Sequence, residues 1–565
     1  MKIFTQKNSS AAVFVILVSL SFYLVVAHYA ESPAGGQDSW NHYLFARWGF
    51  KHPELFIDQW GKPFFTMLAA PFTKWGFTGV YLLNYISVLV TGWLVYLTAR
   101  RIGFKNPWLA ALLFFWQPVV LSNSHSFLTE PSNALLVAGV LYLFSINRFT
   151  GATFVASLLP MARTEGYILL AVVVVFLIIR GKWKLLPVAS VGVALMAILG
   201  AAISGDWLWI YNSNPYFNAH NNPMANANNN FFHYAHLQGN ITGWVISLLI
   251  LISLVLTVGY AIKRFQKKTP SQLLQLSLWL WWPMLILFFL AHSYSWYSGN
   301  FGSHGIHRVF FIVSPVIALQ AQHGLDAIFR LGLVWVNKAT KIVVVLGLFF
   351  GAFPGAGMPY PWQLQDPNRN KPSMAADPYA AHALEMVLFA RQSDSALQKL
   401  LEESNYFNGG KINRVLENSI HRGDALKFMD SLVIADLKTV PANGFNLLIH
   451  QIPEINARLD LDPWGANLQL HEHRKNSSPD FVRNLENWPQ EDRTLLLWSI
   501  GQDPKSDWIP ENSWIVWDSF YGLREGLMEL DRFKNDPRYR LVKSSSISTK
   551  NAGEHAVYLF RKVRK

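Results

Sequence analysis

The chain has 565 residues, of which 51% are hydrophobic, 15% aromatic and 15% charged, and its formal net charge is +13. A soluble globular chain usually carries about 25% charged residues, so this composition excludes a single soluble multidomain protein. Because the chain contains no cysteine, disulfide frameworks, thiolate metal sites and cysteine nucleophiles are excluded as well.

The density of charge changes sharply near residue 354. Residues 1–354 contain 22 Lys or Arg and 8 Asp or Glu, whereas residues 355–565 contain 26 and 27. The first part is therefore poor in charge and strongly basic, and the second has the charge content of an ordinary soluble domain. We predict a membrane domain over 1–354, a Gly- and Pro-rich linker over 355–378 and a soluble extracytoplasmic domain over 379–565. Since the basic excess lies in the membrane part, no nucleic acid partner is indicated.

Apolar stretches recur along the membrane part, most of them long enough to cross about 30 Å of hydrocarbon. The first follows a short basic leader, and we expect it to be retained as a helix because further spans follow it. Together they predict an α-helical polytopic membrane protein with about eleven transmembrane helices, at 11–30, 78–99, 107–122, 132–147, 151–165, 167–180, 185–205, 241–262, 272–291, 309–325 and 341–354.

The two sides of these spans differ in charge. With the N-terminus in the cytoplasm, the inner segments carry sixteen Lys or Arg and the outer segments six. This asymmetry follows the positive-inside rule, and an odd number of spans then places the C-terminal domain outside a bacterial cytoplasmic (inner) membrane. Seven of the eight acids lie at the outer face, which predicts a site there and not a polar path across the bilayer.

Two outer loops are long. Loop 31–77 has aromatic residues spaced as in helices that lie on a membrane surface. Loop 206–240 is rich in asparagine, which is typical of a flexible polar loop. Its histidines, His220, His233 and His236, leave a divalent cation as the alternative.

The C-terminal part alternates between helical and strand patterns. Helical spacing is present near 379–403 and 523–533, and β-like runs occupy 493–500, 513–517 and 555–563. The mixture predicts a small α/β domain. Nowhere does the chain contain a GxxxxGK[ST] phosphate loop, an HExxH zinc helix or a GxSxG elbow, so nucleotide hydrolysis, metalloprotease and serine hydrolase functions have no support.

Three groups of ionisable residues gather at the predicted outer face. A carboxylate there can accept a proton from a hydroxyl while Lys, Arg and His bind a phosphate, each charge-assisted contact contributing about 1.5–3 kcal/mol. The first group follows the first span, the second lies between the third and fourth spans, and the third combines two later loops. Their members are, in that order, Asp38, His42, Asp58 and Lys62; His125 and Glu130; and Arg163, Glu165, His304, His307 and Arg308.

These motifs resemble the polytopic GT-C glycosyltransferases, which include dolichyl-phosphate-mannose-dependent mannosyltransferases and bacterial aminoarabinose transferases. The resemblance covers about residues 1–350 and depends on the order of the motifs. An Asp follows the first span, a Lys-Pro pair precedes the second, an acid-Pro pair follows the third, an Arg-x-Glu-Gly element comes next, and a basic pair precedes a late span. Here these are Asp38, Lys62-Pro63, Glu130-Pro131, Arg163-Thr164-Glu165-Gly166 and His307-Arg308.

The resemblance implies an inverting transfer of a sugar from a polyprenyl phosphate to an acceptor hydroxyl at the extracytoplasmic face. Asp38 would be the general base, with Glu130 as a second catalytic carboxylate. The donor phosphate would be bound by Lys62, Arg163, His307 and Arg308, and the substrates by His42, Asp58, Glu165 and His304. No cofactor is implied beyond a possible divalent cation, and the acceptor, whether glycan, lipid or protein, stays open.

Other interpretations of the same residues remain open. Glu130 would cap a helix beside Pro131, and Arg163 with Glu165 would form a local ion pair at the end of a span. For the whole chain, the alternatives are a transporter or flippase of lipid-linked glycans, which needs polar groups near the membrane midplane, and a non-catalytic scaffold for envelope assembly.

Overall fold

The computed structural model describes residues 4–29, 33–35, 37–215, 231–264, 271–299, 305–352, 446–449, 457–458, 460, 462, 494–497, 511–518, 530–549 and 553–563. They divide into two compact units. The first holds the described residues up to 352 except 37–44, and the second holds residues 37–44 and the described residues from 446 onward. His304 and the linker predicted at 355–378 lie outside the described residues, as does the helix predicted at 379–403.

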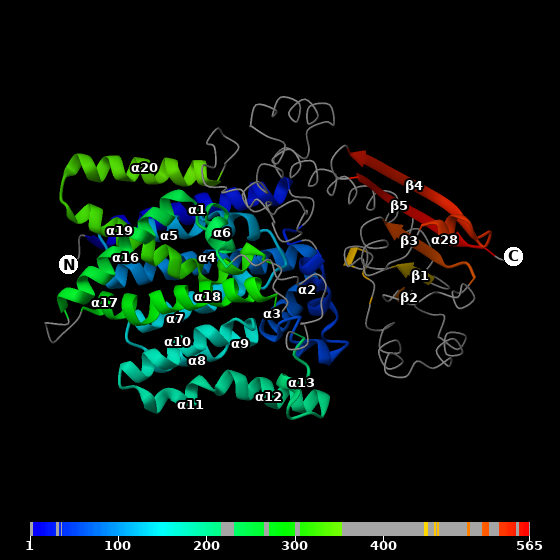
Figure 1. Ribbon diagram of the computed structural model, residues 1–565, viewed down its shortest axis with the longest axis horizontal. Coiled ribbons are helices and arrows are strands. Elements are labelled where there is room, and N and C mark those ends of the chain that lie inside the picture. Colours follow the sequence, from blue (N-terminus) through cyan, green and yellow to red (C-terminus); the bar gives the residue numbers. More distant parts are fainter. Residues whose placement is uncertain are drawn as a thin grey trace. The chain divides into compact units, whose positions relative to one another are not determined.

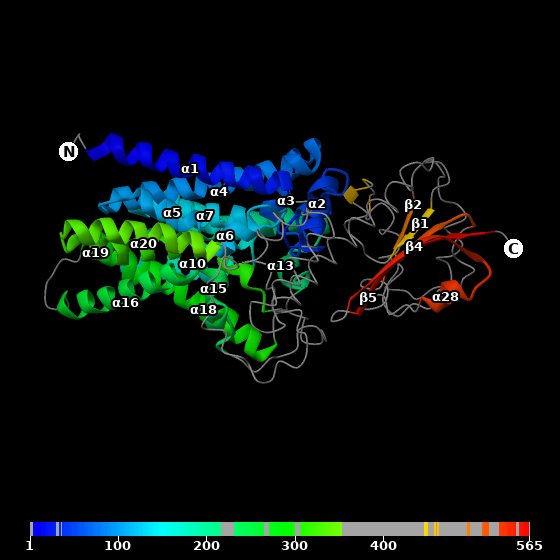
Figure 2. The same cartoon turned by 90° about the horizontal axis from the view of Figure 1, so that it is seen from above.

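The first unit is built of helices that run side by side (Figures 1 and 2). Its first half contains α1 (Phe4–Tyr29), the C-terminal end of α2 (Gln37–Trp48), η1 (Pro53–Phe56), α3 (Pro63–Ala69), η2 (Ala70–Trp75), α4 (Gly76–Ile102), α5 (Trp108–Phe115), α6 (Pro118–Asn123), α7 (Glu130–Ser145), α8 (Phe149–Ser157), α9 (Leu159–Ala162) and α10 (Gly166–Ile179).

The second half of the unit continues in the same way. It contains η3 (Trp183–Leu185), α11 (Leu186–Ala189), α12 (Val191–Ser204), α13 (Trp209–Asn212), α14 (His233–His236), α15 (Gln238–Ile241), α16 (Trp244–Arg264), α17 (Gln272–Leu276), the π-helical turn η6 (Ser277–Trp281), α18 (Trp282–Ser298), η7 (His307–Val313), α19 (Ser314–Arg330) and α20 (Val334–Ala352).

Each of the eleven predicted spans is helical, but some are interrupted. The span predicted at 107–122 is divided into α5 and α6 before Pro118, and that at 151–165 into α8 and α9 before Pro160. Proline lacks the amide hydrogen that a helix needs and disfavours helical backbone in the residue before it, so each new helix begins beside its proline.

Within the described residues, five helical stretches are long and apolar enough to cross a membrane: Pro63–Ile102, Trp183–Ser204, Trp244–Ile262, Gln272–Ser298 and His307–Arg330. Three shorter apolar helices cover Ser9–Val25, Phe149–Ala162 and Gly166–Ile179. By length and composition alone, the described residues therefore contain fewer complete crossings than the eleven predicted.

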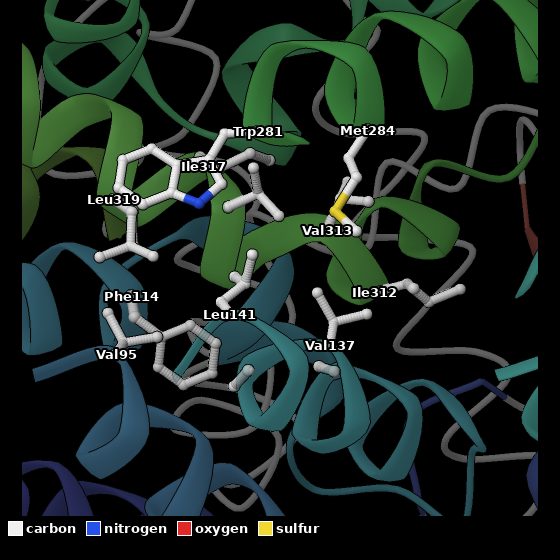
Figure 3. Packing of buried hydrophobic residues seen from close by; sticks show 14 of the residues in the cluster. Val95, Phe114, Val137, Leu141, Trp281, Met284, Ile312, Val313, Ile317 and Leu319 are labelled. Atoms are coloured by element: carbon white, nitrogen blue, oxygen red, sulfur yellow. The ribbon is translucent and has the colours of Figure 1, made fainter. Parts of the chain in front are cut away.

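The core of this unit is a continuous layer of apolar side chains between the helices. Figure 3 shows Phe114 of α5 and Leu141 of α7 facing Ile317 of α19 and Trp281 of η6. These side chains come from segments up to about 200 positions apart in the chain, so burial of apolar surface holds the sequence-distant helices together.

One polar region lies inside the same bundle. We call it the amide–hydroxyl network: Ser253 and Thr257 of α16, Ser277 of η6, and Gln320 and His323 of α19. The Ser253 hydroxyl donates to Gln320 Oε1 at 2.8 Å and lies 3.0 Å from His323 Nδ1, while Gln320 Nε2 donates to the Ser277 hydroxyl at 3.2 Å. The network joins α16, η6 and α19 through neutral hydrogen bonds.

The second unit contains a five-stranded sheet with the order β2-β1-β3-β5-β4. Strand β1 (Asn446–Ile449) is parallel to β2 (Thr494–Leu497) and β3 (Trp514–Asp518), whereas β5 (Gly553–Lys562) is antiparallel to β3 and β4 (Tyr539–Thr549). Helix α28 (Asp531–Lys534) packs Phe533 on the sheet. The three predicted strands are confirmed, and the mixed sheet agrees with the predicted α/β domain.

Candidate functional site

A tight turn before α3 positions Lys62. Asp58 accepts a hydrogen bond from the Gly61 amide at 2.6 Å, and a Cβ at Gly61 would clash with the ring of Phe45. Lys62 itself has φ 64°, a left-handed conformation that costs a residue with a side chain free energy and is common at functional sites. The turn directs the Lys62 ammonium inward, where it donates to Gln59 O at 2.8 Å and to Thr164 Oγ1 at 3.5 Å.

Glu130 is the first residue of α7, and Thr129 is its N-cap. An acid in the first turn interacts favourably with the positive end of the helix. The side chain is completely buried, with Oε1 lying 2.9 Å from Arg163 Nη1 and 3.3 Å from Arg308 Nε. Glu130 is therefore both a first-turn helix acid and the shared counter-ion of two arginines.

The Arg-x-Glu-Gly element forms the turn between α9 and α10. A Cβ at Gly166 would collide with the backbone of Leu159, so the close approach of the two helices requires glycine there. In this turn Arg163 donates to Glu165 through Nη2 at 2.9 Å and Nε at 3.2 Å, and Nη1 donates to Thr129 Oγ1 at 3.1 Å. The local ion pair is confirmed, and Arg163 also reaches across to α7.

The pKa of Glu165 reflects these neighbours. Burial raises the pKa of the Glu165 carboxyl, but the Arg163 guanidinium outweighs burial, with smaller contributions from His292 and Lys62, so its pKa lies well below the usual range. Glu165 is consequently ionised at neutral pH.

His292 also belongs to this region, although the sequence did not single it out. Its Nε2 lies 4.0 Å from Glu165 Oε1, and its ring packs against Phe288, Phe310 and Tyr234. An isolated histidine beside an apolar span has no local signal, and only the packing of α18 against α10 brings it to Glu165.

Arg308 enters from η7, the 3₁₀-helix that precedes α19. Besides its ion pair with Glu130, it donates through Nη1 to the backbone oxygen of Gly35 at 3.4 Å. Its partner in the predicted basic pair, His307, is completely buried. Of this pair, only the Arg308 side chain is therefore partly exposed.

We call Lys62, Glu130, Arg163, Glu165 and Arg308 the ionic cluster. Four separate segments of the chain supply it, and the arginine and lysine side chains are partly or almost wholly buried. Three of the five groups are cations, and two carboxylates hold them in place. Guanidinium and ammonium groups bind phosphate oxygens through charge-assisted hydrogen bonds, so the cluster is suited to bind an anion such as a phosphate.

Three other predicted residues lie in the described part of the chain. Asp38 and His42 lie in α2, in the second unit, with Asp38 half-buried and His42 buried. Asp58 supports the Lys62 turn through Gly61, and burial raises the pKa of its carboxyl despite the nearby Gly61 amide and Lys62.

The histidines of the alternative cation site are only partly described. His233 packs on Trp296 and lies 2.8 Å from the Gly305 oxygen, and His220 lies outside the described part of the chain. Among the described residues, no three His, Asp or Glu side chains are grouped closely enough to hold a metal ion.

No protein-family model matches the sequence, and no curated protein matches it. Two solved structures are similar to the whole chain. ArnT from Cupriavidus metallidurans bound to undecaprenyl phosphate has a TM-score of 0.52 and 12% identity, with 97% of each chain covered. The same protein in the apo state has a TM-score of 0.53 and 12% identity, with 98% of each chain covered. The chain therefore has the fold of ArnT, as its resemblance to the polytopic GT-C glycosyltransferases predicted.

Proposed function

We propose that this protein is an integral membrane glycosyltransferase that moves a sugar from a polyprenyl phosphate to an acceptor hydroxyl. The observation that carries the proposal is the ionic cluster, whose two arginines and one lysine suit the phosphate of such a donor. The ArnT fold supports the same donor class, since ArnT was solved with undecaprenyl phosphate. The surplus of basic residues in the inner segments supports transfer at the extracytoplasmic face of a bacterial inner membrane.

In the proposed reaction Asp38 accepts the proton of the acceptor hydroxyl as its oxygen attacks the anomeric carbon. The bond from that carbon to the phosphate oxygen breaks, and the lipid phosphate leaves as an anion. Lys62, Arg163 and Arg308 stabilise the negative charge on the phosphate. A single displacement of this kind inverts the anomeric configuration.

The buried members of the predicted site have supporting roles in this proposal. Glu130 is inaccessible and holds Arg163 and Arg308 in position, and Asp58 shapes the turn that presents Lys62. His307 is buried beside Arg308 in the chain. Glu165, which is partly exposed and ionised, remains available to a sugar hydroxyl, whereas His42 is buried.

The base is tested with purified protein in detergent and a panel of undecaprenyl-phosphate sugars, including aminoarabinose and mannose. Asp38→Asn is expected to lower kcat by about 10²–10⁴-fold, the usual contribution of a general base. Asp206→Asn is the matched control, because Asp206 accepts only from its own loop, Leu208 N and Asn212 Nδ2, in the contacts described. Full transfer by Asp38→Asn would exclude the proposed mechanism.

The phosphate contacts are tested by binding of undecaprenyl phosphate alone. Arg163→Met is expected to weaken binding at least tenfold, since each charge-assisted contact is worth about 1.5–3 kcal/mol. Lys74→Met, which removes an exposed cation next to α4, is expected to leave binding unchanged. Mass spectrometry of envelope glycans from a strain lacking this protein would then identify the sugar and the acceptor.

A transporter of lipid-linked glycans remains the second candidate, and the amide–hydroxyl network is the observation in its favour. Polar groups inside a bundle, beside a π-helical turn, are a feature of transport sites. Translocation of labelled lipid across proteoliposomes without formation of a new glycosidic bond would support it. Transfer by the purified protein alone would support the enzyme.

A further inference from the structure

The short segment 33–35 connects α1 to α2, and its backbone is fixed to the helical unit by two contacts. The Ala34 amide donates to the oxygen of His125 at 2.8 Å, where Ala34 and Ser126 form a β-bridge. The oxygen of Gly35 accepts from Arg308 Nη1 at 3.4 Å. The segment is thereby tied both to the 124–128 loop and to the ionic cluster.

The 124–128 loop is itself held rigidly. Asn84 of α4 donates from Nδ2 to Ser126 O at 2.7 Å and to Leu128 O at 3.1 Å. The Tyr85 hydroxyl lies 2.6 Å from His125 Nδ1, and the Tyr81 ring stacks on the imidazole with 4.0 Å between centroids. Segment 33–35 thus rests on a loop whose backbone and side chains are both fixed by α4.

Gly35 meets two demands that no other residue meets at this place. Its φ is +89°, which a residue with a Cβ adopts only under strain. An added Cβ would also lie 2.7 Å from Leu128 Cδ2 and 2.8 Å from Cδ1. A side chain here would therefore push segment 33–35 away from the 124–128 loop.

We propose that Gly35 is a positioning residue for Asp38. Asp38 follows Gly35 by only three positions in the chain. The contacts of segment 33–35 with the 124–128 loop and with Arg308 therefore fix the backbone from which the chain continues to the proposed base. Arg308 contacts both the Gly35 oxygen and Glu130. This inference rests on the proposed function.

The test compares Gly35→Ala with Gly103→Ala in the full-length protein. Gly103 has a similar φ of +91° but no atom within 4 Å of its added Cβ, so it reproduces the backbone strain without the collision. Gly35→Ala is expected to lower kcat for sugar transfer about 10–100-fold, with affinity for undecaprenyl phosphate unchanged within about twofold. Gly103→Ala is expected to change neither quantity. Leu128→Ala in the Gly35→Ala background should restore part of kcat because it removes the collision.

The outcomes separate this inference from the proposed function. Unchanged kcat in folded Gly35→Ala, alongside inactive Asp38→Asn, would overturn the role of Gly35 alone. Full activity in Asp38→Asn would overturn the function itself. If Gly35→Ala does not fold, Asn84→Leu tests the contact from the other side, since it releases the 124–128 loop without altering Gly35. That variant should also lose kcat while binding undecaprenyl phosphate, and a wild-type kcat would contradict the proposal.

Discussion

The helical unit buries two polar regions that differ in kind. The ionic cluster gathers full charges from the loops and helix ends, with Glu130 shared between Arg163 and Arg308. The amide–hydroxyl network gathers neutral groups from the helices α16, η6 and α19, with Gln320 shared between Ser253 and Ser277. Each has a central side chain with two partners, but only the first is made of charged groups.

This difference separates groups that join helices from groups suited to bind a ligand. Neutral hydrogen bonds that satisfy one another inside a bundle stabilise it by about 0.5–1.5 kcal/mol each and attract no ion. Guanidinium and ammonium groups, by contrast, bind anions such as phosphate through charge-assisted hydrogen bonds. Substitutions in the first region should therefore change ligand binding and stability together, and those in the second only stability.

The largest effect is expected for Glu130→Gln. Removing one partner of a buried ion pair costs about 3–5 kcal/mol, because Arg163 and Arg308 stay buried without their counter-charge. The midpoint of thermal unfolding in detergent should fall clearly, and transfer activity should fall at least 100-fold as the arginines shift.

Glu54→Gln is the matched control, since Glu54 is 44% exposed. It should change stability by less than about 0.5 kcal/mol and leave transfer unchanged. Equal behaviour of the two variants would mean that Glu130 does not organise the arginines.

An intermediate effect is expected for Gln320→Leu. The variant leaves the hydroxyls of Ser253 and Ser277 without their shared amide, which should cost about 1–3 kcal/mol in unfolding experiments while kcat and affinity for undecaprenyl phosphate stay as in the wild type. Gln322 lies two positions later in α19, is also fully buried, and makes no side-chain hydrogen bond among the described residues. Gln322→Leu should therefore be neutral or stabilising, and a loss of activity in Gln320→Leu would assign the network a functional role.

The smallest effect is a difference in pH dependence. Arg163 outweighs burial and lowers the pKa of Glu165 below its ordinary 4.5, so the stabilisation it gives is complete above that pH and is lost as the pH falls toward the depressed value. Glu165→Gln should lower the unfolding midpoint at pH 7, and the difference from wild type should narrow below about pH 4.5.

The pH dependence of stability that Asp58 contributes has the opposite sign to that of Glu165. Burial raises the pKa of its carboxyl, so protonation favours the folded state and that contribution is lost as the pH rises through the raised value. Asp58→Asn keeps an oxygen that accepts from Gly61 and should equal or exceed wild-type stability at pH 7. If the unfolding midpoints of Glu165→Gln and Asp58→Asn changed with pH in the same way, the opposite pKa shifts assigned to the two carboxyls would be contradicted.

Much of the fold was predictable because apolar runs and charge density are local properties. The predicted span at 132–147 coincides closely with α7, and the run at 513–517 with β3. Proline chemistry could have predicted the helix breaks at Pro118 and Pro160. They were not predicted because the apolar sequence continues across both prolines, so the pattern predicts one span in each stretch. Strand β4 was not predicted, because its sequence, YRLVKSSSIST, alternates poorly and is polar over half its length.

The site was predictable only in part. Each motif contains a charged residue that the sequence alone identifies. Arg163 and Glu165 are also close enough in sequence to form an ion pair locally. Glu130 was assigned a catalytic role because sequence cannot distinguish an accessible carboxylate from a buried one. His292 and Gly35 were missed, since neither carries a motif and both depend on a neighbour more than 90 positions away.

The sequence by itself determined that this chain has a basic, apolar helical part followed by a part of ordinary charge content, because hydrophobic length and charge balance are set residue by residue. Only the tertiary structure decided that Arg163 and Arg308, 145 positions apart, share one carboxylate and that His307 faces inward. Such convergence depends on how α7, α9 and η7 pack, and packing is a property of many side chains together.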